Sequence, residues 1–150
     1  MSNLGIMKLA FVVLISLLGP SAWGCSFTPR SAEELFANAK MLFRARVIEA
    51  RVVSVGIPAF QRSHESVEAR YELSEVLISA PPSSGVVREV PFGCGSCSLG
   101  LRPSVEYVFF LNEDGVVWGP TGSFALVSDT GGKERAERLA EFRRLASGTK

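Results

Sequence analysis

The chain has 150 residues, of which 47% are hydrophobic and 21% are charged, with 16 basic and 15 acidic side chains. This length fits one domain that can bury a core of its own. The near-neutral balance argues against a surface that binds nucleic acid or anionic membrane, because both require a surplus of Lys and Arg.

The first 24 residues have the layout of a secretory signal peptide. Lys8 supplies a positive charge, and the apolar run that follows it over residues 9–18 is shorter than the about 20 residues that a membrane span needs. Small residues at Ala22 and Gly24 predict cleavage after Gly24. Removing 24 of the 150 residues leaves 126, so we expect an exported protein, periplasmic or secreted, whose mature part is one domain over residues 25–150.

The same region supports a second interpretation. Ala22-Trp23-Gly24-Cys25 partly resembles a lipobox, in which the cysteine is lipidated and anchors the mature protein to a membrane. Ala22 stands in place of the usual Leu, and bulky Trp23 in place of a small residue. A membrane-anchored lipoprotein therefore remains the alternative localisation.

The mature part opens with the pattern of a short helix followed by a long strand. Ser31 and Glu34 have the spacing of a capping box, so we expect a helix to begin at Ser31. From Met41 to Val55, apolar and polar residues alternate, which predicts a long strand with one buried face. The alternation slips near Glu49, which indicates a bulge there.

A loop and a second long strand are expected next. Residues 56–66, which include His64, show turn formers and no sustained periodicity, so they predict an exposed loop. Alternation from Val67 to Ile78 predicts the second strand, and the Pro, Ser and Gly residues of 81–85 end it.

Short strands and turns fill most of the remaining chain. Val86 to Phe92 is predicted as a third strand, and Gly93 to Pro103 as a tight segment rich in Gly and Cys. Val105 to Leu111, dense in aromatic residues, is the predicted fourth strand. A turn over residues 112–115 leads from it into a strand at Val116 to Trp118.

The predicted chain ends with a short strand, Phe124 to Val127, and a charged helix from about Lys133 to Ala146. Glu134 and Arg138 in that helix are spaced for an i,i+4 ion pair. One side of the helix carries its apolar residues, Ala136, Leu139, Phe142 and Ala146. Together these elements predict a mainly β fold, a small OB-like antiparallel β-barrel with a short N-terminal helix and a C-terminal helix.

Several short motifs stand in a characteristic order along the mature chain. They are Cys25-Ser26-Phe27, the helix end Phe36-Ala37-Asn38-Ala39-Lys40, the strands of residues 42–47 and 71–78, Cys94-Gly95, Gly100 and Tyr107-Val108-Phe109-Phe110-Leu111. This order resembles the netrin-like family, which includes the tissue inhibitors of metalloproteinases and has an OB-type barrel. The resemblance covers nearly all of the mature chain.

Three cysteines, Cys25, Cys94 and Cys97, follow the predicted signal, and a disulfide is the default for them in an oxidising compartment. In the inhibitors the N-terminal cysteine is bridged to a barrel cysteine followed by Gly, so the resemblance implies a bridge between Cys25 and Cys94. Phe27 stands where the family commonly has a second cysteine, which leaves Cys97 as a competing partner for Cys25. If Cys25 is lipidated, the other two cysteines have only each other.

The sequence argues against catalysis. Cys94-Gly95-Ser96-Cys97 has redox spacing, but Gly100 follows closely and no helix start is predicted to stabilise a thiolate. A zinc site of Cys25, Cys94, Cys97 and His64 is disfavoured because only one pair has ligand-like spacing. The common hydrolase, nucleotide-binding and metalloprotease motifs are missing. We therefore expect no enzyme activity, no resident metal and no cofactor.

Two classes of function remain open. The resemblance implies a binding module that inhibits a zinc metalloprotease, with the free amine and carbonyl of Cys25 chelating the zinc and Ser26 entering the cleft. The alternative is an envelope-associated structural module or lipoprotein without inhibitory activity. The expected partner is thus a zinc protease or another envelope or extracellular protein. We expect the binding surface to involve Cys25, Ser26, Phe27 and Thr28 rather than residues 56–66, because a bridged terminus is preorganised.

Overall fold

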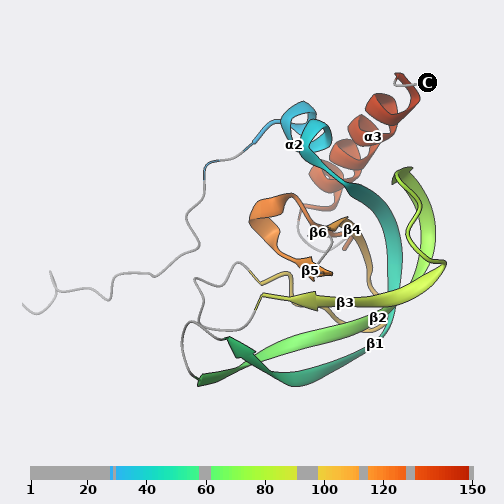
Figure 1. Cartoon of the computed structure of the whole chain (residues 1–150). Coiled ribbons are helices and arrows are strands. Elements are labelled where there is room, and N and C mark those ends of the chain that lie inside the picture. Colours follow the sequence, from blue (N-terminus) through green and yellow to red (C-terminus); the bar gives the residue numbers. More distant parts are fainter. Residues whose placement is uncertain are drawn as a thin grey trace, which may run out of the picture.

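The computed structural model describes residues 28, 30–57, 62–90, 98–111, 115–127 and 131–148 (Figure 1). The predicted signal peptide, Cys25, Ser26, Phe27, Cys94 and Cys97 lie outside the described residues. The elements in chain order are α2 (Ala32–Asn38), β1 (Met41–Ile57), β2 (Arg62–Ile78), β3 (Ser84–Glu89), β4 (Glu106–Leu111), β5 (Val116–Val117), the 3-10 helix η2 (Gly119–Thr121), β6 (Phe124–Ala125) and α3 (Gly132–Gly148).

The six strands form one sheet in the order β5-β3-β2-β1-β4-β6, which curls into a half-barrel (Figure 1). The predicted mainly β, OB-like barrel is confirmed, with a short helix before the first strand and a longer helix after the last one. One pairing differs from the predicted antiparallel arrangement. Strand β5 lies parallel to β3, with Arg88 opposite Val116, so the chain after β4 crosses the barrel instead of continuing next to β4.

The start of α2 follows the capping pattern read from the sequence. The backbone N–H of Glu34 donates to Ser31 Oγ at 3.1 Å, which satisfies one of the helix's unpaired donors. Ala32 and Leu35 are buried on the side of the helix that faces the sheet. The predicted helix start is therefore confirmed.

Strands β1 and β2 form a long hairpin of 17 residues each. The register shifts between Val47 and Glu49, so Ile48 is an extra residue with no Cα partner on β2. This is the bulge that the broken alternation predicted. Two further shifts, near Leu42 and Arg44, accompany the strong curl of β1 (Figure 1).

The exposed loop predicted over residues 56–66 is wrong for most of its length. Strand β1 continues to Ile57 and β2 already begins at Arg62, so His64 lies in β2 opposite Val55. Ser66 is fully buried, and its hydroxyl donates to the backbone oxygen of Glu89 at 2.6 Å. Residues 62–66 form a strand through backbone pairing with β1, and their mostly polar side chains leave little hydrophobic periodicity to read.

The sheet is buried on both faces where β1 and β4 pair. The inner face carries the barrel core, with the stacked rings of Tyr107 and Phe109 at its centre. The outer face carries a second cluster under the helices, Ala32, Leu35, Leu42, Val108, Phe110, Leu139 and Phe142. Two buried faces explain why β4 reads as a continuous apolar run.

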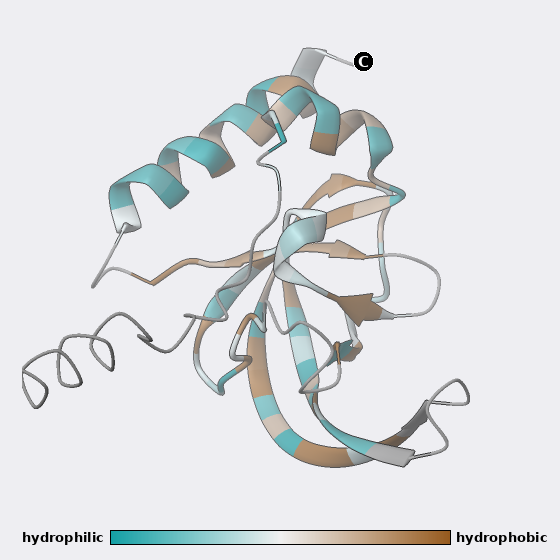
Figure 2. Ribbon diagram, turned by 90° about the vertical axis from the view of Figure 1, so that its left-hand side faces the viewer, coloured by the Kyte–Doolittle hydropathy of each residue, from teal (hydrophilic) through white to brown (hydrophobic). Residues whose placement is uncertain are grey.

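Helix α3 lies across the outer face of the sheet and shows hydrophilic residues along most of its length (Figure 2). Leu139 and Phe142 are buried as predicted, but Ala136, one turn before Leu139, is exposed. Arg138 lies 5.5 Å over the ring of Phe124, so the expected pair with Glu134 gives way to a cation–π contact. Neither described helix has the length and apolar character that would let it cross a membrane.

Candidate binding surfaces

The N-terminal segment meets the domain at α2. Of the four residues predicted to bind a partner, only Thr28 is described, and it is exposed. Three residues later Ser31 caps α2, and Leu35 fixes the helix in the outer cluster. The point at which the segment leaves the domain is therefore held by both a cap and a buried side chain.

A groove of about 830 Å³ opens at this point, between α2, α3 and η2. Leu35, Pro120 and Gly122 contribute apolar and backbone surface to it. Charged side chains of both signs surround that surface: Arg30, Glu134, Glu137, Arg138, Glu141 and Arg144. A partly apolar groove with charges of both signs suits a protein segment better than a single anion or cation.

The shape of the groove depends on Gly122. Its φ of 110° lies in the left-handed region, where side chains are strained. A Cβ there would come within 3.1 Å of the Phe110 ring and 3.2 Å of Leu35. Glycine thus allows η2 to approach the sheet closely enough to form one wall of the groove.

Charges also link α2 to α3 beside the groove. Arg144 of α3 lies 3.9 Å from the Glu33 carboxylate of α2. The pKa of Glu33 is lowered, chiefly by a backbone hydrogen bond at the helix start, then by the hydroxyl of Ser31 and by Arg144. These contacts favour one relative position of the two helices.

A buried carboxyl group lies inside the barrel, next to the cysteine segment. Glu89 is 1% exposed and accepts hydrogen bonds from Ser98 Oγ at 2.9 Å and from the Leu101 N–H at 3.1 Å. The hydroxyl of Tyr107 holds the same segment by donating to the Gly100 oxygen at 2.8 Å. Glu89 therefore fixes the chain directly after Cys97. A sequence signal was present, because Glu89 has the inward phase of Val87 in β3.

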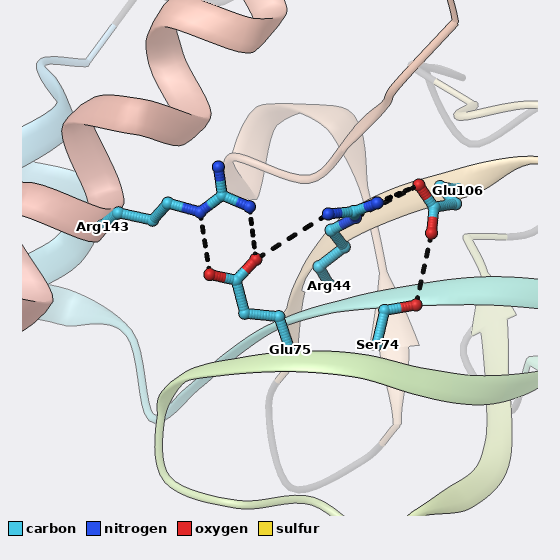
Figure 3. A network of polar contacts seen from close by, with 5 residues as sticks. All are labelled: Arg44, Ser74, Glu75, Glu106 and Arg143. Carbon is cyan, nitrogen blue, oxygen red and sulfur yellow. Dashed lines mark hydrogen bonds and ion pairs between the residues drawn. The ribbon is translucent and has the colours of Figure 1, made fainter.

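A polar network ties α3 to the outer face of the sheet (Figure 3). Arg143 donates two hydrogen bonds to Glu75, at 2.8 Å and 2.6 Å. Arg44 lies between Glu75 and Glu106, and Ser74 donates to Glu106 at 3.3 Å. The hydrogen bonds from Arg143 are the main cause that lowers the pKa of Glu75. Every charge in the network has an opposite partner, so its arrangement is that of a structural clamp.

A second set of charges crosses β1, β2 and β3 on the outer face of the hairpin. Glu49 pairs with Arg70 at 3.2 Å, and Arg51 pairs with Glu68 at 2.6 Å. Arg88 of β3 reaches the other oxygen of Glu68 at 2.7 Å. The pKa of Glu68 is lowered, first by Arg88 and then by Arg51.

The zinc alternative gains nothing from the described residues. His64 lies within the paired hairpin and not in a loop. Within the described ranges, no three His, Cys, Asp or Glu side chains gather as a metal site would require. The cysteines of that alternative lie outside these ranges, and so does the predicted disulfide.

Comparison with known proteins adds no relative. No protein-family model matches the chain, and a search of curated proteins found no match either. The groove and the buried Glu89 were missed by the sequence reasoning. The groove combines α2 near the start of the domain with η2 and α3 near its end, so no local pattern indicates it.

Proposed function

We propose that this chain is an exported binding module that inhibits a zinc metalloprotease through the amino terminus of its mature form. The observation that carries the proposal is the fixed exit point of the N-terminal segment. Thr28 is exposed, while Ser31 and Leu35 hold the base of the segment through a helix cap and a buried contact. A short segment on a rigid base loses little entropy on binding.

The chemistry proposed for this segment requires cleavage before Cys25. The α-amino nitrogen and the carbonyl oxygen of Cys25 would then coordinate the protease zinc and displace its catalytic water. Ser26 would follow into the cleft. The groove next to Arg30 supports this binding mode, because it offers mixed charged and apolar surface at the base of the N-terminal segment.

The mechanism predicts a pH dependence of inhibition. An α-amino group binds metal only when neutral, and such groups titrate near pH 8. The neutral fraction of the amine rises with pH, so we expect inhibition to become tighter, with a smaller inhibition constant, as the pH is raised from about 6 to about 8. This is measured with a zinc protease whose own activity is known over the same range.

The decisive experiment combines intact-mass measurement of the exported protein with one insertion. We expect a mature chain that begins at Cys25, and we expect an Ala inserted before Cys25 to abolish inhibition without changing the circular dichroism spectrum. An Ala added after Lys150 is the matched control and should leave inhibition intact. A diacylglyceryl mass on Cys25, or a protein that inhibits no zinc protease, would contradict the proposal and favour the envelope module. Equal inhibition by both insertion variants would contradict zinc chelation by Cys25.

A further inference from the structure

The open edge of the sheet at β1 begins where its pairing with β4 ends. Within the described residues, Val47 is the last residue of β1 with backbone hydrogen bonds on that side, donating to the Val105 oxygen at 3.0 Å and accepting from Ser104 N at 2.8 Å. From Ile48 to Ile57, the described part of the chain pairs with β1 only through β2. This part of β1 lies in the lower part of the half-barrel in Figure 1, where it runs together with β2.

Unpaired N–H and C=O groups at such an edge recruit other strands, and proteins usually blunt an edge with charged side chains, Pro or bulges. This edge carries two charges of opposite sign, Glu49 and Arg51, two residues apart on the same outer face. In an antiparallel pairing centred on Ala50, each Glu49 would lie opposite the Arg51 of another copy. The edge is therefore self-complementary in charge.

The same register also matches the apolar residues. Ile48 and Val52 are exposed to 36% and 62%, so both have apolar surface that a second strand can cover. They stand two residues before and two residues after Ala50 in the sequence, so in this register the bulged Ile48 of each copy would lie opposite the Val52 of the other. Antiparallel pairing about Ala50 thus covers both side chains at once.

We propose that two copies of this chain associate through their β1 edges, in an antiparallel, two-fold arrangement centred on Ala50. The occupant of the edge is a second copy because charge and apolar pattern both repeat about one residue, as an isologous contact requires. The alternation of charges then continues from one molecule into the other. Arg70 and Glu49 of the first copy are followed by Arg51 and Glu68 of the second.

The test is a charge exchange followed by sedimentation equilibrium on the full mature protein. Wild-type protein is expected to dimerise reversibly. E49R alone and R51E alone place like charges opposite each other, so each should weaken dimerisation at least about tenfold. An equimolar mixture of E49R and R51E restores both opposite-charge pairs and should form a heterodimer with nearly the wild-type affinity.

The matched control is R70E, which breaks the ion pair with Glu49 inside one molecule but changes no side chain on β1. It should keep the dimer, and all variants should keep the wild-type circular dichroism spectrum. A wild-type protein that remains monomeric up to millimolar concentration overturns the proposal. So does a mixture of E49R and R51E that fails to associate, or an R70E variant that dissociates as fully as they do.

Discussion

Replacing Glu89 with Ala should destabilise the domain because a buried acceptor is lost. Glu89 is 1% exposed, and its two oxygens accept from Ser98 Oγ and from the Leu101 N–H. Removing it leaves the buried Leu101 N–H without its acceptor, which costs about 1–3 kcal/mol. The variant no longer has to bury a carboxyl group, and this gain offsets part of the loss of the hydrogen bond from Ser98. With the cavity included, we expect the free energy of unfolding to fall by about 3 kcal/mol.

Urea unfolding at fixed redox state, with the slope compared between variants, measures this loss. Glu89→Gln keeps the shape and one acceptor oxygen, so it should cost about 1 kcal/mol. Glu65→Ala, an exposed acid on the adjacent strand, is the control and should stay within about 0.5 kcal/mol of wild type. If Glu89→Ala were as stable as this control, the anchoring role assigned to the carboxyl group would be wrong.

Two further predictions concern the attachment of α3. Phe142→Ala removes a fully buried ring that contacts Phe110 at a centroid distance of 5.2 Å. The free energy of unfolding, measured by heat or urea, should therefore fall by about 3–5 kcal/mol. Ala136→Ser, at an exposed position of the same helix, is the control and should change it by less than about 0.5 kcal/mol. The pKa of Glu75 is lowered in the folded state by Arg143, so its contribution to stability is present above the pKa of an unfolded Glu, near 4.3, and is lost as the pH falls through the lower folded value. Below about pH 4.5 the stability of Arg143→Ala should therefore decline less steeply with acid than that of wild type, and equal slopes would contradict the assigned cause.

Local chemistry was readable from the sequence where it acts within a few residues. Ser31 and Glu34 predicted the start of α2 because a cap involves neighbouring residues. The slip near Glu49 predicted the bulge because one extra residue inverts the alternation that follows it.

Features that depend on distant partners were missed. Residues 62–66 form a strand because β1 pairs with them, although their own side chains give no periodic signal. The parallel pairing of Val116 with Arg88 and the exposure of Ala136 both depend on how the barrel closes. The groove shares this origin, since α2, η2 and α3 meet there from opposite ends of the chain.

The bulge at Ile48 of β1 also limits how the gene can change. Past the pair of Val53 and Ser66, none of the described side chains of the two strands belongs to the barrel core, so codons added or lost there in both strands together leave the core in place. The insertion or deletion of one codon in one strand alone would turn every side chain beyond it to the other face, unless a new bulge compensated for the shift. Divergent sequences with this architecture should therefore change β1 and β2 in matched steps at the tip, and keep the length of Met41 to Val47 constant.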